Sequence, residues 1–415
     1  MARLSSWSAL GLVFILSGVH NGLNAAQSGP YIIDNKDLAL SLEQIRAGNP
    51  RFLTAESALI QKANSALNQP LLSVMDKTLL AASGNKHDYY SFPPYWWPDP
   101  TKKDGLPYIR RDGQNNPDAS SDATDKKRLV RMSNNVYNLT LAWYFTQDKR
   151  YAEKAAEQIR VWFLDPATRM NPNMIYAQAT PGVNTGRGTG IIDTRVLVNV
   201  VDAIALLHSA DLIKESEYKQ LQQWFGSLYS WMVASPNGLK EDSGKNNHGT
   251  WYDLQTATFA QFSGKSEEAK KRLTTTQNRR IPNHFDAEGK QMRELARTRS
   301  WHYSNFNLEA YSQLAKLGEK VHVDIWNHEV DNQNLLKGYT YIAHFVDSKT
   351  PWPWKDLDKM DDKKALLSLS RAAKAWPDNA LLNEKARYLQ AKYPEDITIL
   401  ITPLSVRPVD GKNKQ

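Results

Sequence analysis

Two short stretches of this chain gather side chains that can do acid–base chemistry. The stretch 246–253 (NNHGTWYD) offers amide donors, a titratable imidazole and two aromatic rings, in a turn or at the start of a helix. Its glycine would let the backbone come close to a ligand. The stretch 297–303 (RTRSWHY) adds two guanidinium groups, another imidazole and a phenol. Such a set of groups suits an oxygen-rich, negatively charged substrate.

The same groups meet the requirements of β-elimination from a 4-linked uronic acid polymer. That reaction removes the proton at C5, stabilises an enolate on the C6 carboxylate and protonates the leaving O4. Asn247 and Arg297 can neutralise the carboxylate, so that the C5 proton becomes acidic enough to leave. Tyr303 is the expected acid, since an unperturbed tyrosine has a pKa of about 10. The base is either the imidazole of His248 or Tyr303 itself, according to the configuration at C5.

These residues also have structural interpretations. A histidine between Asn247 and Gly249 can cap a helix or satisfy a buried carbonyl, and Tyr303 beside Trp301 can pack in the core. His302 is expected to support the site or to lie beside the substrate.

A proline-rich loop contains candidate sugar-binding rings. Residues 87–100 (HDYYSFPPYWWPDP) hold four prolines, which remove backbone donors and fix φ, so this stretch is a structured loop and not an interior helix. Aromatic faces stack well on the apolar faces of sugar rings. Tyr90, Trp96 and Trp97 therefore either form sugar subsites or fill a small core within the loop itself.

A second loop, 171–193, contains Gln178 and a glycine-rich run around Arg187. The run lacks the Gly-Lys-Ser/Thr ending of a phosphate-binding loop, so nucleotide binding is excluded and Arg187 is a candidate contact for a carboxylate. The residues expected to bind substrate are Tyr90, Trp96, Trp97, Gln178, Arg187, Asn246, Trp251, Arg299 and His302.

Composition limits the class of protein. The chain has 415 residues, of which 41% are hydrophobic, enough for one large core or two modest ones. It has no cysteine, which excludes disulfides, a thiolate nucleophile and a lipoprotein anchor. The net charge of +8 favours polyanions, although it could also reflect a generally basic surface. We expect a monomer that binds an acidic polysaccharide and no nucleic acid.

The first 26 residues have the three-part form of a secretory signal. Arg3 is followed by an apolar run at 9–16 and by small residues at Ala25 and Ala26. The run is too short to span a bilayer well, and a buried N-terminal helix is the alternative. We therefore expect a periplasmic or secreted protein that has no membrane contact after cleavage.

The remainder of the chain has a helical pattern. Convincing alternating strands are scarce, and paired helices separated by loops indicate an all-α fold, a toroid or incomplete barrel of helical hairpins with long loops on one face. We expect a catalytic domain over 27–355 and a C-terminal extension over 356–415, with a helical pair at 366–393 and a disordered end at 408–415. Apolar residues at spacings of three and four predict helices at 129–145, 152–163, 194–208, 215–233, 250–262, 305–317, 335–345 and 361–375.

Several motifs together resemble the alginate lyase domain family over about residues 50–355. They are YYS at 89–91, YWWPDP at 95–100, LDPATRMNP at 164–172, NNHGTWYD at 246–253 and ELART at 294–298. Within that group the chain is most similar to polysaccharide lyase family 38 and more distantly to family 5.

This resemblance implies a helical toroid that cleaves alginate or glucuronan. It also implies a catalytic Asn–His pair and a tyrosine with an arginine nearby, which fall on Asn247, His248, Tyr303 and Arg297. Two further arginines, at positions 293 and 299, lie close enough in sequence to be alternatives to Arg297. The particular polyuronate does not follow, because members of the family differ in substrate.

Two other classes of protein remain open at this point. A glycoside hydrolase on a similar helical barrel would need two carboxylates about 5 to 10 Å apart. A non-catalytic binder of acidic glycans would hold the polymer without cleaving it. No metal and no cofactor is expected, since the histidines are scattered and cysteine ligands are missing. The nominal carboxylates for hydrolysis are Asp88, Asp193, Asp253 and Glu294.

Overall fold

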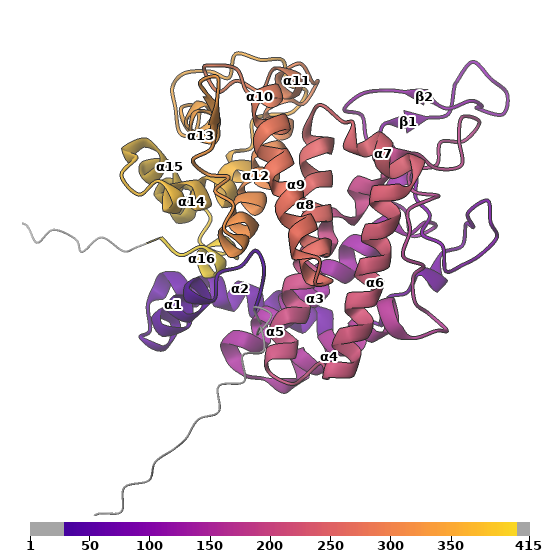
Figure 1. Cartoon of the computed structure of the whole chain (residues 1–415), viewed down its shortest axis with the longest axis horizontal. Coiled ribbons are helices and arrows are strands. Elements are labelled where there is room, and N and C mark those ends of the chain that lie inside the picture. The colour runs from indigo at the N-terminus through magenta and orange to yellow at the C-terminus, as the bar shows by residue number, and fades with distance from the viewer. Residues whose placement is uncertain (1–28, 405–415) are drawn as a thin grey trace, which may run out of the picture.

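The structure is a computed structural model that describes residues 29–404 (Figure 1). The predicted signal peptide at 1–26 and the predicted disordered end at 408–415 lie outside the described residues. Within 29–404, no helix is long and apolar enough to cross a membrane.

Helices form almost all of the regular structure, as predicted, and each of the eight expected segments coincides with helix. The fold is an (α/α) toroid in which neighbouring helices pack as hairpins, for example α3 on α4 and α8 on α9. The α-helices are α1 (Asn35–Arg46), α2 (Pro50–Leu67), α3 (Lys126–Thr146), α4 (Lys149–Ile159), α5 (Leu197–Ser209), α6 (Glu215–Ala234), α7 (Pro236–Asp242), α8 (Asn247–Phe262), α9 (Ser266–Thr275), α10 (Ile281–His284), α11 (Met292–Leu295), α12 (Ser300–Val321), α13 (Leu335–Ala343), α14 (Leu366–Ala375), α15 (Ala380–Lys392) and α16 (Thr398–Ile401).

Short elements join these helices. Two small antiparallel hairpins pair β1 with β2 and β3 with β4, so that Trp96 lies opposite Arg110 in the first. In Figure 1, β1, β2, α7 and α11 lie along the upper side, where long connections emerge. The short elements are η1 (Val74–Asp76), η2 (Pro117–Ser120), η3 (Arg160–Leu164), η4 (Gly188–Val196), η5 (Thr276–Arg280), η6 (Asp362–Ala365), β1 (Trp96–Trp97), β2 (Ile109–Arg110), β3 (Glu329–Val330) and β4 (Gln333–Asn334).

Side-chain caps define where several helices begin. The side chain of Asn49 accepts a hydrogen bond at the start of α2, and Pro50 follows at a position where a missing N–H does no harm. Asn246 caps α8 in the same way. Because such caps satisfy otherwise free N–H groups, they place the first turn of each helix reproducibly.

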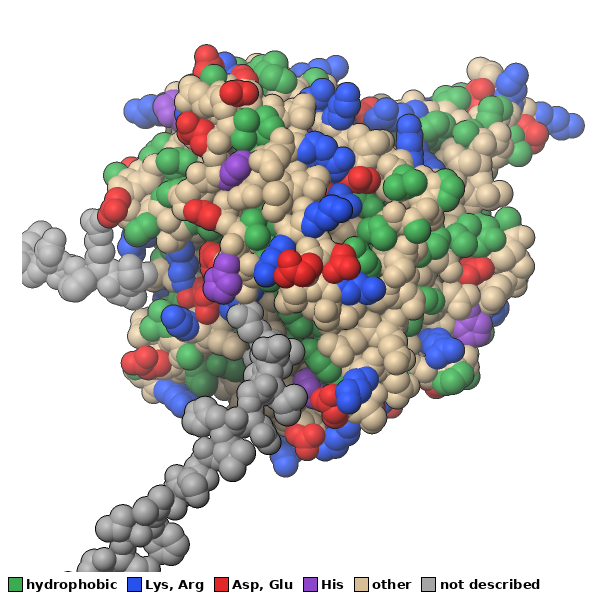
Figure 2. All heavy atoms as spheres, viewed as in Figure 1, with side chains coloured by type: hydrophobic (Ala, Val, Ile, Leu, Met, Phe, Trp, Pro, Cys, Tyr) green, Lys and Arg blue, Asp and Glu red, His purple; other side chains and the backbone are tan. Residues whose placement is uncertain are grey.

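Charged side chains are mixed on the face that Figure 2 shows. Lysine and arginine side chains are scattered there among aspartate and glutamate side chains, with uncharged surface between them. The excess positive charge of the chain is therefore not concentrated on this face.

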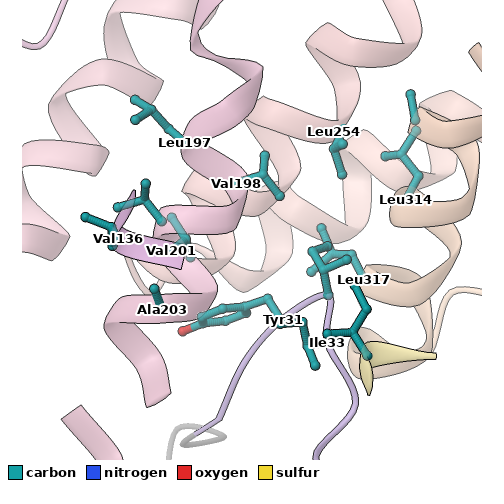
Figure 3. Close-up of a cluster of buried hydrophobic side chains, with 14 of the residues drawn as sticks. Tyr31, Ile33, Val136, Leu197, Val198, Val201, Ala203, Leu254, Leu314 and Leu317 are labelled. Atoms are coloured by element: carbon teal, nitrogen blue, oxygen red, sulfur yellow. The ribbon is translucent and has the colours of Figure 1, made fainter. Parts of the chain in front are cut away.

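One apolar core connects the N-terminal segment with helices from the middle and the end of the chain. In Figure 3, Tyr31 lies near Ala203 of α5, and Ile33 lies near Leu317 of α12. The buried carboxylate of Asp202 on α5 accepts backbone N–H groups from this segment, at 2.5 Å from Tyr31 and 2.8 Å from Ile33. The segment is thus held by both packing and hydrogen bonds.

The C-terminal helices belong to the same core. Helix α14 packs on α12, α15 packs on α13, and α16 contacts both α1 and α2. Leu400 and Leu404 are buried in the core cluster. The residues after 355 therefore connect the N-terminal helices α1 and α2 with the helices α12 and α13.

Candidate active site

A cleft of about 580 Å³ opens where the β1–β2 hairpin, η4, the α7–α8 junction and the start of α12 meet. The two stretches that the sequence singles out, 246–253 and 297–303, both contribute to its wall. The predicted site residues that line it are Trp96, Gln178, Arg187, Asn246, Asn247, His248, Arg297, His302 and Tyr303.

Asn247 and His248 occupy the first turn of α8. The Asn246 side chain caps the helix by accepting the N–H of His248 at 3.2 Å. Asn247 is fully buried and donates twice to Glu294, from its backbone N–H at 2.5 Å and from Nδ2 at 2.8 Å. Its Oδ1 has no hydrogen-bond partner within the described residues. The second N–H of Nδ2 can still serve a ligand, at a helix end that favours negative charge.

A buried carboxylate orients the imidazole of His248. Nδ1 of His248 lies 2.6 Å from Oε1 of Glu241, whose side chain is only 2% exposed. An ionised carboxylate can only accept, so Nδ1 carries a proton that it donates to Glu241. This leaves Nε2 as the ring atom that can accept a proton.

The phenol of Tyr303 lies between another phenol and a guanidinium group. Its hydroxyl is 2.6 Å from the hydroxyl of Tyr95, and the guanidinium carbon of Arg297 is 3.7 Å from the centre of its ring. Burial raises the pKa of Tyr303, as does Tyr95, whereas the positive charge of Arg297 opposes the rise. The phenol is therefore protonated in the resting site.

Arg297 is held by an aspartate from a distant loop. It donates to Asp112 from Nη2 at 2.9 Å and from Nε at 3.3 Å, and the Thr298 hydroxyl adds a bond of 2.9 Å to the same carboxylate. Burial raises the pKa of Asp112, but Arg297 and Thr298 outweigh it and bring the pKa to about 2. The loop after β2 is thereby tied to the start of α12.

Of the three clustered arginines, only Arg297 lines the cleft. Arg293 donates to the backbone oxygen of Asn283 at 2.9 Å, and Arg299 forms an ion pair with Asp358. The geometry therefore favours Arg297 for contact with a substrate.

Positive charge dominates the wall of the cleft. Arg187 lies 5.6 Å from the centre of the Trp96 ring and donates to Oε1 of Gln178 at 2.8 Å. Burial lowers the pKa of Arg187 to about 10, so it stays charged at neutral pH. The cationic side chains that line the cleft are those of Arg110, Lys126, Arg187, Arg195, Lys240 and Arg297.

Both carboxylates that line the cleft are engaged by neighbours. Glu241 binds His248, and Asp193 accepts hydrogen bonds from Ser91 at 2.7 Å and from Gln178 at 3.0 Å. A hydrolase would need one carboxyl group free to protonate the leaving oxygen and a second to act as nucleophile or base.

The other nominal hydrolytic carboxylates do not line the cleft. Glu294 lies behind Asn247, and Asp253 is fully buried in an ion pair with Arg280 at 2.9 Å. Asp88 accepts a hydrogen bond from Asn171 at 2.8 Å. The arrangement offers no pair of free carboxylates for hydrolysis.

Four predicted substrate-binding residues lie elsewhere. The Tyr90 ring packs edge-on against Phe92, and Trp97 donates its Nε1–H to a backbone oxygen at 3.0 Å, so these rings contribute to packing of the proline-rich loop. Arg299 is paired with an aspartate as described above. Trp251 is 3% exposed and lines a smaller neighbouring cavity.

The glycine of the first stretch has a packing role. A Cβ atom at Gly249 would lie 2.4 Å from the backbone oxygen of Gly244 and 2.5 Å from a guanidinium nitrogen of Arg280. Gly249 therefore lets the backbone approach the α7–α8 turn and Arg280. The expectation that it brings the backbone close to a ligand is not what the packing shows.

Sequence reasoning did not identify several residues that complete the site. Glu241 has a local signal, since it precedes His248 by seven residues at the end of a short helix. Tyr95 lies within the proline-rich loop, but nothing in that loop distinguishes it from its aromatic neighbours. Arg195, Lys240 and Asp112 carry no local signal at all, because only the tertiary fold brings the first two to the cleft and the third to Arg297.

No group of three or more His, Cys, Asp or Glu side chains in residues 29–404 is arranged to hold a metal ion.

Comparisons with known proteins identify the family of this chain. The sequence model of the alginate lyase family matches residues 73–352. The crystal structure of an alginate lyase from Bacteroides ovatus has a TM-score of 0.85 and 34% identity, and the match covers 91% of this chain and 100% of that one. Alginate lyase A1-III from Sphingomonas species A1 has a TM-score of 0.49 and 11% identity, over 84% of this chain and 95% of that one. A search of curated proteins gave no match. The chain belongs to the alginate lyase family.

Proposed function

We propose that this protein is a polysaccharide lyase that cleaves a 4-linked polyuronate, with alginate as the first candidate and glucuronan as the second. The observation that carries the proposal is the meeting of Tyr303, Arg297 and the Asn247–His248 pair in one cation-lined cleft. Membership of the alginate lyase family supports the reaction type. The similarity to an alginate lyase from Bacteroides ovatus supports the substrate class.

In the proposed reaction, Nε2 of His248 removes the C5 proton. Glu241 stabilises the imidazolium that forms, since its carboxylate already accepts the Nδ1 proton. The electron pair of the C5–H bond first adds charge to the C6 carboxylate and then forms the C4–C5 double bond. The remaining N–H of Asn247 and the N-terminal turn of α8 stabilise that charge as it develops.

Tyr303 completes the elimination by donating its proton to O4 as the C4–O4 bond breaks. Its raised pKa keeps the phenol protonated until that step. The phenolate that remains lies against the guanidinium of Arg297, 3.7 Å from the ring centre, which stabilises the negative charge. The products are a shortened polymer and a chain that begins with a 4,5-unsaturated uronate.

We infer that the protein acts in the periplasm or outside the cell. The form of its first 26 residues supports this location, since it is that of a secretory signal. Acidic polysaccharides are also extracellular polymers, in agreement with a cation-lined cleft.

The proposal is tested by incubating the protein with polymannuronate, polyguluronate and glucuronan. We expect ultraviolet absorbance from the 4,5-unsaturated product to rise with at least one polymer, while chain length, followed over time, separates internal from terminal cleavage. A hydrolase would shorten the polymer without absorbance, and a binder would do neither. Either outcome would contradict a lyase.

A further inference from the structure

A second cavity lies directly beside the cleft. It has a volume of about 270 Å³ and is enclosed by the start of α5, by α8, by one face of α12 and by η6. Arg195, His302 and Phe306 line both this side cavity and the cleft. These three side chains therefore form the partition between the two spaces, and a group in the side cavity would lie next to the reacting centre.

Four polar side chains that line the side cavity form no side-chain hydrogen bond with the described residues. The Nε1–H of Trp251 is buried and has no hydrogen-bond partner in the described part of the chain. Asn199, Glu309 and Gln313 also line the cavity, and their side chains form no hydrogen bond with any residue of 29–404. Buried polar groups in native proteins are nearly always paired. The buried Nε1–H of Trp251 lacks the partner that this rule leads us to expect, and the three neighbouring side chains have hydrogen-bonding groups to offer a ligand in the same space.

Two cations of the side cavity, Arg195 and Lys364, form no close ion pair with the described residues. Their positive charges, with that of Arg371, oppose the rise that burial causes in the pKa of Glu309. The guanidinium of Arg195 lies 5.9 Å from the Trp251 ring centre and 5.3 Å from that of Phe306, and its side chain donates only to the backbone oxygen of Ile192, at 3.2 Å. Lys364 is exposed at the side of η6 and forms no ion pair with the described residues. Most guanidinium N–H groups of Arg195 are thus free to bind an anion.

This combination of groups matches one uronate ring. Two cations suit its carboxylate, the amides of Asn199 and Gln313 together with the carboxylate of Glu309 suit its hydroxyl groups, and an indole N–H adds one more donor. The volume of about 270 Å³, against about 580 Å³ for the cleft, leaves room for a sugar unit and not for a chain.

We propose that the side cavity binds a single uronate unit, as the end of a polymer chain or as a released monouronate. The identity of the ligand rests on the proposed lyase function, because that reaction brings uronates to the adjoining cleft. The cavity would then hold a chain end beside the reacting bond or retain a product after cleavage.

The test is titration calorimetry with mannuronate and glucuronate as probes and with mannose and glucose as neutral controls. Gln313→Leu keeps most of the side-chain volume and removes the amide, and Lys364→Gln removes one charge at an exposed position. Lys363→Gln is the matched control. Lys363 is the exposed neighbour of Lys364, but it pairs with Asp396 at 3.4 Å and does not line the cavity.

We expect the wild type to bind a monouronate and not the neutral sugars. Gln313→Leu should weaken that binding roughly tenfold, since a buried hydrogen bond to a ligand is lost. Lys364→Gln should weaken it about threefold, as expected for an exposed charge, while Lys363→Gln should not change it. Thermal unfolding should show that Gln313→Leu is as stable as the wild type or more stable, because an unpaired amide has been removed.

Two results would overturn the side cavity as a uronate site. One is a wild type that binds neither monouronate, and the other is a Gln313→Leu protein that binds it as well as the wild type does. Failure of the lyase proposal is distinguishable: no polymer would yield unsaturated product, yet monouronate binding would remain sensitive to Gln313→Leu. If a polymer did yield unsaturated product while Gln313→Leu left monouronate binding unchanged, the lyase proposal would stand and the side-cavity proposal would fail.

Discussion

Glu241 Oε1 lies 2.6 Å from Nδ1 of His248, and the carboxylate is almost completely buried while the imidazole side chain is 24% exposed. The buried partner fixes the ring, and the exposed part of the ring reaches the cleft. This relationship explains why α7 and α8 must meet at a short turn, because each helix contributes one member of the pair.

Replacing Glu241 should therefore weaken the proposed base, His248, without removing it. Glu241→Gln keeps the hydrogen bond but loses the charge that stabilises the imidazolium, so kcat should fall about tenfold to a hundredfold. Glu267→Gln on the exposed face of α9 is the control. A Glu241→Gln protein with the kcat of the wild type would contradict the role of Glu241.

Tyr303→Phe should remove the acid and preserve the fold. The substitution deletes one oxygen and keeps the ring against Arg297, so we expect an unchanged circular dichroism spectrum and a loss in kcat of at least about a hundredfold. Tyr144→Phe, at a half-buried ring that packs on Phe145, is the control. Near wild-type kcat for Tyr303→Phe would show that another group protonates O4.

The cation-lined cleft should make turnover sensitive to salt. Charges are screened over about 10 Å at 0.1 M ionic strength, so kcat/KM on a polyuronate should fall between low and physiological salt. Arg187→Gln should raise KM and reduce this salt dependence. Arg131→Gln, which removes an exposed charge paired with Asp122, should do neither. A kcat/KM that does not respond to ionic strength would count against electrostatic attraction of the substrate.

The buried His284 should make stability depend on pH. Its Nδ1 lies 2.9 Å from the Tyr311 hydroxyl, and burial, together with nearby arginines, lowers its pKa to about 3. The unfolded chain binds a proton below about pH 6.5 and the folded chain does not. The contribution of His284 to stability is therefore complete above about pH 6.5 and decreases as pH falls from there toward 3, by a few kcal/mol at most.

Thermal unfolding of the wild type and of His284→Gln between pH 7 and pH 4 would measure this contribution. We expect the difference in melting temperature between pH 7 and pH 4 to be smaller in the variant, since glutamine does not titrate. His344→Gln, at an exposed histidine, should behave as the wild type does. An equal pH dependence in all three proteins would contradict a neutral buried His284.

Local sequence patterns determined most of the helical fold and pointed to two stretches that both line the candidate cleft. Apolar spacing predicts α4 and α6 because each buries one stripe of its own surface. It does not predict α9, in which only Ala269 and Leu273 are buried and the other residues are mostly charged or polar. The pair Asn247–His248 was predictable, because an Asn before a helical run marks the first turn.

The tertiary structure alone decided how these side chains are held. Asp112 and Arg297 are 185 positions apart, and Tyr95 and Tyr303 are 208 positions apart, yet each pair is in hydrogen-bond contact. Helix periodicity and capping are local and are readable along the chain. Closure of a toroid depends instead on which apolar faces pack together over the whole chain, and no local pattern records that choice. The sequence therefore determines which groups can do the chemistry, while packing determines which carboxylates and cations surround them.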